Sequence, residues 1–457
     1  KSLIGNTLKP HYMVQTSPGL TRHFLQPMAR GVVRLLVIVP VMASGDVVIE
    51  LIDGQRIVVP VEKSEVRSIE FSASNGPVSS EPTSEREHIT AGAEANRSSS
   101  SQTWRVGPGY ALQRPSDAAK QAQDGDIVEI RAGTYPNDYA KWRQNDITIR
   151  GIDGMVHLKS DGLIPNRKGI WILKGNNIVI ENIEFSGAAV KDGNGAGIRH
   201  EGGNLTLRNS FFHHNEFSIL SGRLPEASIE ILSSRFWFQK RKKRFSHGIY
   251  IGNARRFTLI GSHFKGTDQG HQVKSRAFEN HILYNRIEDI PGGKSSRLID
   301  LPNCGLSFII GNDLHQAATS QNFTAIGYGH EGCENRTQAQ KMLYGMHNTF
   351  VNEARSSTFV DNQAGGDATV ANNLFFGNVN PLKGDGEASS NVREQLAQRV
   401  KDSWAAPHGS AAINGAAQFS SVGGVSLLPG FEFTPPIGTR QRQRHGPLDV
   451  GSHEASP

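Results

Sequence analysis

Cysteine is scarce in this 457-residue chain, which contains only Cys304 and Cys333. Two cysteines are too few for a disulfide framework, so a packed core must hold the fold together. Metal-ligand spacings of the Cys-x-x-Cys or His-Glu-x-x-His kind are absent, and no phosphate-binding glycine loop joins a strand to a helix. These absences argue against a motif-defined zinc site and against a nucleotide-binding loop.

Long hydrophobic runs are also missing, and no stretch approaches the length of a membrane span. The clearest apolar run is 35–42, which follows the basic Arg30 and Arg34 and precedes the small residues 43–45. This order is typical of a secretory signal, although a buried strand is the alternative. If 1–45 comprises an upstream segment and a signal, the working protein is exported, secreted or periplasmic, and has no membrane span.

Charge of one sign is not in large excess. Lys and Arg number 49 against 43 Asp and Glu, which gives a net charge of +6 and a pI near 9.2. A mild positive excess is compatible with an acidic partner, such as an anionic glycan, a nucleic acid or a membrane surface, without choosing among them.

Composition divides the chain into successive regions. After 1–45, residues 46–71 alternate apolar and polar side chains around Asp53-Gly54 and predict a β-hairpin module. Residues 72–103 have the polar composition of a linker. We expect the main domain over 104–380 and an irregular segment over 381–457 that packs on it or caps it.

The main domain is built from short β-rich runs that recur at regular intervals. Eight of these runs close on a large apolar residue, at spacings of 23 to 28 residues with one of 36: Phe185, Phe212, Phe236, Phe264, Ile287, Leu314, Phe350 and Phe375. A strand repeat of this period, without helical periodicity, indicates a solenoid whose turns bury one shared core.

The repeat favours an all-β, right-handed parallel β-helix over other solenoids, because the Leu-x-x-Leu-x-Leu signature of leucine-rich repeats is absent. Asparagine recurs where the turns are expected, and it suits either stacked amide ladders or left-handed turns. These residues are Asn182, Asn209, Asn285, Asn312, Asn348 and Asn373.

The segment "PSDAAKQAQDGDIVEIRAGTYP" at 115–136 predicts a helix and a strand that close the first end of the stack. This segment resembles the entry to the pectin-lyase-like superfamily. The ending "GPLDVGSHE" at 446–454 is similar to the closing segment of such proteins. The resemblance spans about three quarters of the chain and implies the β-helix fold.

Three consecutive turns carry unusual polar residues in the same phase, in "HGIYIG", "HQVKSRA" and "RLIDLP". Parallel strands lie about 4.8 Å apart, so these residues form two columns of neighbours. The second column alternates with apolar residues and is expected to face solvent, whereas the direction of the two histidines is left open. The columns are His247, His271 and Arg297, and then Tyr250, Lys274 and Asp300.

Such a surface suits β-elimination on a uronic-acid polymer. The reaction needs the substrate carboxylate neutralised, the C5 proton removed and the leaving oxygen protonated. Arg276 and Arg297 favour a neutral, basic Lys274, provided that Asp300 does not cancel their charges. We assign catalysis to the cluster of Lys274, Arg297, His247, Tyr250 and His271, and substrate binding to Arg276, Gln272, Asp300, Tyr328 and Glu331.

The stretch "QVKSRAFENHILYNRI…SSRLIDLPNCG…IIGN" is similar to the catalytic region of polysaccharide lyase family 6, the alginate and chondroitin-B lyases. The resemblance implies Lys274 as base and Arg297 as acid. That family places acidic calcium ligands where this chain has Gln269 and Thr267, so we expect no cofactor. The expected partner is an anionic polysaccharide, with no nucleic acid, and the oligomeric state stays open.

Other functions stay open on the same fold: a C5-epimerase, a glycoside hydrolase using Asp300 and Glu331, or a non-catalytic glycan-binding solenoid. Single cations on a solvent face are usually only solvated. Cys304 and Cys333 lie 29 residues apart, about one turn, a spacing that allows a stacked disulfide in an exported protein.

Overall fold

The computed structural model describes residues 101–239, 246–400 and 402–455, together with the strands β1 (Asp46–Glu50) and β2 (Arg56–Pro60). β1 and β2 pair antiparallel. The rest of the predicted hairpin module, the signal-like region 1–45 and the linker up to residue 100 lie outside the described residues.

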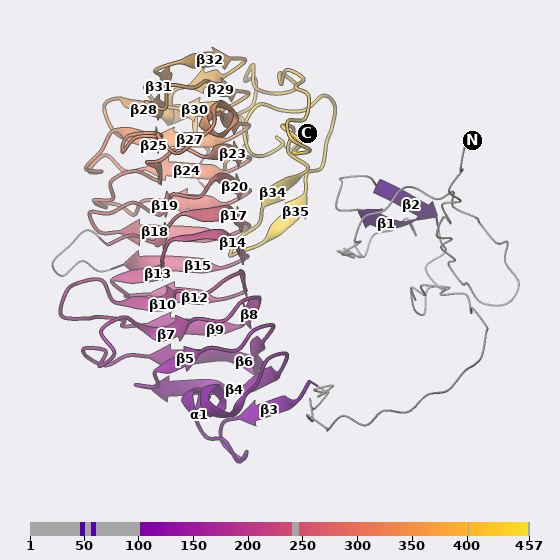
Figure 1. Ribbon diagram of the computed structural model, residues 1–457. Helices are drawn as coiled ribbons and strands as arrows, with labels where there is room; N and C mark the ends of the chain where they lie inside the picture. Colours follow the sequence, from indigo (N-terminus) through magenta and orange to yellow (C-terminus); the bar gives the residue numbers. More distant parts are fainter. Residues whose placement is uncertain (1–45, 51–55, 61–100, 240–245, 401, 456–457) are drawn as a thin grey trace, which may run out of the picture. The chain divides into compact units, whose positions relative to one another are not determined.

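From Thr103 the chain winds into a right-handed parallel β-helix (Figure 1). Each turn contributes one strand to a ten-stranded sheet, here called the narrow sheet, and most turns contribute two strands to a 21-stranded sheet. The narrow sheet comprises β5 (Ala140–Trp142), β7 (Gly169–Leu173), β10 (Ala196–His200), β13 (Phe217–Ser221), β16 (Ile249–Ile251), β19 (Val273–Ser275), β22 (Ile299–Leu301), β25 (Thr324–Tyr328), β28 (Ser357–Asn362) and β31 (Val379–Lys383).

The 21-stranded sheet bends within each turn, so that it forms two rows of strands. The first strands are β3 (Thr103–Val106), β4 (Ile127–Pro136) and β6 (Thr148–Lys159). They are followed by β8 (Ile178–Glu181), β9 (Ile183–Ser186), β11 (Leu205–Arg208), β12 (Phe211–His213), β14 (Leu224–Leu232), β15 (Arg235–Gln239), β17 (Ala254–Ile260), β18 (His263–Thr267), β20 (Glu279–Leu283), β21 (Arg286–Glu288), β23 (Leu306–Ile310), β24 (Asp313–Gln316), β26 (Leu343–Met346), β27 (Thr349–Asn352), β29 (Ala368–Ala371), β30 (Leu374–Phe376), β32 (Gly386–Ser389) and β33 (Val392–Glu394).

The predicted anchor residues form one inward column. Phe185 pairs with Phe212, and the register continues turn by turn to Phe375. The phenylalanine rings at the start of this column stack with centroids 4.8, 5.2 and 4.5 Å apart. Because each ring is fully buried between its neighbours, the column forms the shared core that the repeat predicts.

The asparagines divide between the two predicted roles. Asn285, Asn312, Asn348 and Asn373 form a buried amide ladder, with side-chain hydrogen bonds of 2.9 to 3.0 Å from each turn to the next. Asn182 and Asn209 adopt left-handed backbone angles, with φ of 59° and 42°, and share one side-chain hydrogen bond of 2.7 Å outside this buried ladder. The buried ladder satisfies the amides of sharp turns that water cannot reach.

The first end of the solenoid is covered by α1 (Pro115–Gln121), which packs on β5 and buries Ala118 completely (Figure 1). The repeat predicted an end near residue 380, but the last strand of the solenoid, β33, ends at Glu394. Its Arg393 pairs with the anchor Phe375. The final turn needs no apolar anchor, because no further described strand stacks on it. The spacing of apolar anchors therefore did not predict this turn.

The C-terminal segment after η2 (Leu396–Gln398) runs along the outside of the 21-stranded sheet and includes the hairpin β34 (Phe431–Phe433) and β35 (Thr439–Gln441). Trp404 and Val450 pack on Val351 and Phe376, which belong to β27 and β30. The C-terminal segment therefore packs along the solenoid rather than capping it.

The short 3-10 helix η1 (Gln338–Lys341) lies in the loop before β26.

Candidate functional site

The predicted second column exists in the narrow sheet. Tyr250 of β16, Lys274 of β19 and Asp300 of β22 are in register on successive turns. Their apolar neighbours Ile249 and Val273 are fully buried in the core, so the column residues point outward. The alternation of side chains was sufficient to place all three on one face.

The histidines of the first column stack directly before these strands. The rings of His247 and His271 have centroids 5.1 Å apart and planes within 4°. The backbone N–H of His271 donates to His247 Nδ1 at 3.0 Å, and that of Arg297 donates to His271 Nδ1 at 3.1 Å. Each Nδ1 is thus an acceptor, which places the ring proton of the neutral imidazole on Nε2.

The direction of the histidines, which the sequence left open, is toward the outward column. His271 Nε2 lies 3.4 Å from Asp300 Oδ2. Burial lowers the pKa of His271 to about 4, with the nearby Asp300 opposing this shift and Lys274 adding to it. Burial, His271 and Lys274 hold the pKa of His247 well below its usual range. Both rings are therefore neutral at pH 7.

Charged side chains form a connected network around Lys274. Its Nζ lies 3.1 Å from Asp300 Oδ2 and 2.8 Å from Glu331 Oε1. Arg276 binds the other oxygen of Glu331 at 2.6 Å, and Arg297 binds Asp300 at 2.8 Å. Three cations against two carboxylates leave a formal excess of +1 in this cluster.

Asp300 is the buried counter-ion of this network. Burial alone would raise the pKa of Asp300, which is 1% exposed. The adjacent His271, Lys274 and Arg297 outweigh burial and lower this pKa, so the carboxylate stays charged at pH 7. Asp300 is therefore a structural anion within the column, covered by His271, Lys274 and Arg297, and not an exposed substrate contact.

Two expectations for Lys274 need correction. Its side chain is 9% exposed rather than open to solvent, because the carboxylates of Asp300 and Glu331 enclose the amine. The condition that Asp300 should not cancel the neighbouring cations is also not met, since Asp300 contacts both Lys274 and Arg297. In this arrangement the lysine donates hydrogen bonds to two anions.

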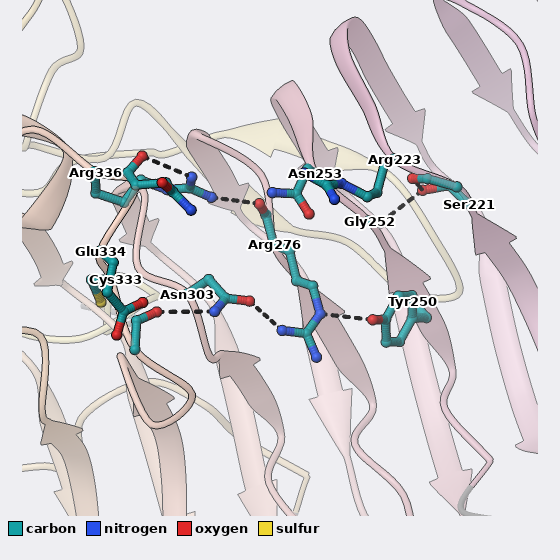
Figure 2. A pocket seen from close by; sticks show the side chains of 13 residues that line it. Ser221, Arg223, Tyr250, Gly252, Asn253, Arg276, Asn303, Cys333, Glu334 and Arg336 are labelled. Atoms are coloured by element: carbon teal, nitrogen blue, oxygen red, sulfur yellow. Dashed lines mark hydrogen bonds between the residues drawn. The ribbon is translucent and has the colours of Figure 1, made fainter.

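Arg276 connects the network to a neighbouring cavity. The network and this cavity together are here called the groove. Its Nε donates to Tyr250 Oη at 2.7 Å, and its Nη1 donates to Asn303 Oδ1 (Figure 2). The cavity has a volume of about 430 Å³ and is lined by Ser221, Gly222, Arg223, Tyr250, Gly252, Asn253, Arg276, Asn303, Gly332, Cys333, Glu334, Asn335 and Arg336. Its polar lining and three arginines suit an anionic, hydroxyl-rich ligand.

Several cavity residues were missed from the sequence. Arg223, Asn253 and Asn303 each follow the end of a narrow-sheet strand by two residues, and the predicted residue Arg276 follows one by a single residue. The sequence pattern that could have identified them is a polar residue just after each of several successive strands. Arg336 had no such signal, because it comes from a long loop and reaches back to the backbone carbonyl of Arg276 at 2.7 Å.

Two residues predicted to bind substrate do not reach the surface. Gln272 is fully buried and is held by Thr267 Oγ1 at 2.6 Å. Tyr328 is also fully buried, in register with the core residue Leu301, and its hydroxyl donates to the carbonyl of Gly305 at 2.9 Å. Neither can contact a ligand in the groove.

Cys304 and Cys333 form a disulfide with a Cα–Cα distance of 5.7 Å, as the one-turn spacing suggested. The bond fastens the loop that carries Glu331 and the cavity residues after it to the turn that follows β22. No group of three metal-ligating side chains lies in this groove within the part of the chain that the structure describes.

Comparisons with known proteins agree with this architecture. Residues 142–339 match the family model described as "Right handed beta helix region". The crystal structure of pectate lyase Pel9A superposes with a TM-score of 0.51 at 12% identity, covering 78% of this chain and 97% of that chain. No curated protein sequence matches the chain.

The fold is thus the pectin-lyase-like right-handed parallel β-helix. At 12% identity the likeness to the pectate lyase is one of fold alone. Among the described residues, no helix is long and apolar enough to cross a membrane.

Proposed function

We propose that this protein is an exported, carbohydrate-active β-helix protein that cleaves a uronic-acid polysaccharide by β-elimination. One observation carries the proposal: Glu331 places its two carboxylate oxygens on Lys274 and Arg276, at 2.8 and 2.6 Å. These two cations form a carboxylate clamp at the edge of an arginine-lined cavity.

Glu331 can act as an internal substitute for the carboxylate of a uronate. Its side chain is 46% exposed and belongs to the loop after β25, whereas the clamp residues belong to the turn of β19. A substrate carboxylate offers the same pair of oxygens and can take the same place. Because one anion replaces another, the charge balance of the cluster is unchanged on binding.

The clamp residues supply two of the three requirements of β-elimination. Arg276 neutralises the substrate carboxylate, which stabilises the charge that develops as the C5 proton leaves. Once the substrate has displaced Glu331, Lys274 loses a proton to solvent, and the neutral amine then accepts the C5 proton. The electrons of the C5–H bond form the C4–C5 double bond, and the C4–O bond breaks.

Tyr250 is the acid that the geometry favours for the leaving oxygen. Its hydroxyl oxygen accepts a hydrogen bond from Arg276, so its own proton is available for the substrate. The family resemblance implied Arg297 for this step. However, Arg297 is bound to Asp300 and contacts His330, and it does not line the cavity.

The proposal is tested by incubating the purified protein with alginate, pectate and glycosaminoglycans. We expect ultraviolet-absorbing unsaturated uronates from at least one of these polymers. Proton exchange at C5 without chain scission would instead identify an epimerase, and saturated reducing ends a hydrolase. No turnover on any polyanion would contradict all the enzymatic functions.

Replacing Glu331 by glutamine is expected to tighten polyuronate binding about 3- to 10-fold at low salt, because the clamp loses its internal competitor. Isothermal titration calorimetry with a defined oligouronate measures this. Glu334→Gln is the matched control, since Glu334 lines the same cavity but makes no ion pair with the clamp. Equal effects of the two changes would mean that only overall charge matters.

A second candidate function is non-catalytic glycan binding, and it is favoured by the pairing of every cation in the network with a carboxylate. A binding protein needs the clamp but not a base. Binding without turnover across the polymer panel would support this alternative.

We also propose that the protein works in an oxidising compartment outside the cytoplasm. The disulfide between Cys304 and Cys333 supports this location, since such bonds persist mainly in exported proteins.

A further inference from the structure

A second cluster of chemically active side chains lies on the 21-stranded sheet, which does not include the strands that carry the groove. His157, Glu184 and His213 come from β6, β9 and β12, which belong to three successive turns. Their side chains are 18 to 23% exposed, so a solute can reach them. Nothing in the proposed polysaccharide chemistry uses these three residues.

The ligand atoms of the cluster converge on one point. Glu184 Oε1 lies 2.8 Å from His213 Nε2 and 3.4 Å from His157 Nε2. All three ligand atoms lie within 4.8 Å of one another. A four-coordinate zinc ion with bonds of about 2.0 to 2.2 Å holds its ligand atoms roughly 3.3 to 3.6 Å apart, so small side-chain movements suffice.

The neighbouring His214 can hold the ring proton of His213 on Nδ1, so that Nε2 is left to bind a metal. The Nδ1 atoms of the two rings are 2.7 Å apart, a distance that holds one proton between them. If His213 carries that proton and His214 accepts it, His213 Nε2 has a free lone pair directed at the cluster. Metal-binding histidines are usually oriented by such a partner on the other ring nitrogen.

We propose that His157, Glu184 and His213 form a binding site for a divalent transition metal of the zinc class, with an open fourth position. Two imidazoles and one carboxylate match zinc, whereas calcium prefers oxygen ligands alone. The ion joins β6, β9 and β12, and so ties together three early turns of the solenoid.

Two neighbours limit the affinity of the site. Ser186 Oγ lies 2.7 Å from His157 Nε2 and must turn away when a metal takes that nitrogen. Arg235, stacked on Phe211 with 4.2 Å to the ring centroid, brings a positive charge near Glu184. Arg235→Gln is therefore expected to tighten metal binding.

Histidine–glutamate pairs occur elsewhere on the same sheet, and they provide the control. His281 Nε2 lies 2.6 Å from Glu279 Oε1, but the structure places no third ligand with this pair among its described residues. A simple pair of this kind is a hydrogen bond between neighbouring side chains. The third ligand is what distinguishes the His157 cluster.

The test is isothermal titration of the full, metal-free chain with Zn²⁺, repeated with Co²⁺ while the visible ligand-field absorption is recorded. We expect one ion per chain at this site and a rise in the temperature of unfolding. His157→Gln, Glu184→Gln and His213→Gln should each weaken this binding at least 100-fold, and His214→Gln about 10-fold. His281→Gln should leave it unchanged.

Two results would overturn the site: no saturable binding, or binding that survives His213→Gln and Glu184→Gln. Unfolding of each variant without metal shows that the fold is intact, so that a loss of binding is not a loss of structure. The outcome is independent of the polysaccharide assays, because no clamp residue is changed.

Discussion

Replacing Lys274 by alanine is expected to lower kcat/KM for the polyuronate substrate by roughly 10² to 10⁴-fold, the usual contribution of a general base. The change also removes half of the carboxylate clamp, so binding weakens as well. The initial rate of unsaturated-uronate release measures the effect. Lys274→Arg separates the two roles, because it keeps the positive charge and loses an effective base.

Lys141→Ala is the matched control for this experiment. Lys141 belongs to β5, in the same outward column several turns before the groove. Removing it changes the net charge equally and should leave the rate unaltered. The fold should survive Lys274→Ala, since Asp300 keeps Arg297 at 2.8 Å. Full activity of Lys274→Ala would show that another group removes the proton.

The second large effect concerns stability and the C-terminal segment. Asp313 of β24 is fully buried and binds Arg286 at 2.7 Å, His453 at 2.9 Å and Ser452 at 2.7 Å. Asp313→Asn leaves buried cations without their anion and should lower the free energy of unfolding by about 3 to 5 kcal/mol. Denaturant titration measures this.

An exposed ion pair serves as the reference for that change. Asp192 binds Arg167 at 2.9 Å, and both side chains are more than half exposed. Asp192→Asn should alter stability by no more than about 0.5 kcal/mol. Similar losses in the two variants would mean that the buried network contributes nothing beyond a surface pair.

The same network predicts how stability depends on pH. Burial opposes the charged form of His453, but Asp313 and Glu432 outweigh it and raise the pKa of His453 to about 9. A raised folded-state pKa stabilises the fold fully below about pH 6.5 and loses this contribution as the pH rises through 9. The denaturant midpoint of unfolding should therefore be higher at pH 6 than at pH 9.5. His453→Gln should reduce this difference.

Much of the architecture could be predicted from the sequence, because stacking repeats the same physical demand every turn. The spacing of the phenylalanines fixed which residues share the core, and the alternation around Lys274 fixed which face the column occupies. Tyr328 could also have been placed correctly, since it follows the core residue Leu301 by one turn.

The contacts that decide the chemistry could not be predicted in the same way. Glu331 is 57 residues from Lys274 and reaches it through a loop whose path depends on the disulfide and on Asn303. Alternation tells which side of a strand a residue takes, but not what covers it. This is why the sequence indicated an exposed amine where the fold encloses one.

The winding of the chain also has a consequence for how such a protein can change in length. Adding or removing one complete coil far from β16 to β22 leaves the spatial relation among Tyr250, Lys274 and Asp300 intact, since each depends only on the adjacent coils. Deleting a single residue within β19 would rotate the amine of Lys274 toward the interior. The domain can therefore gain or lose whole coils along its axis. Within the reactive centre, a change of one residue in the strand register is not tolerated.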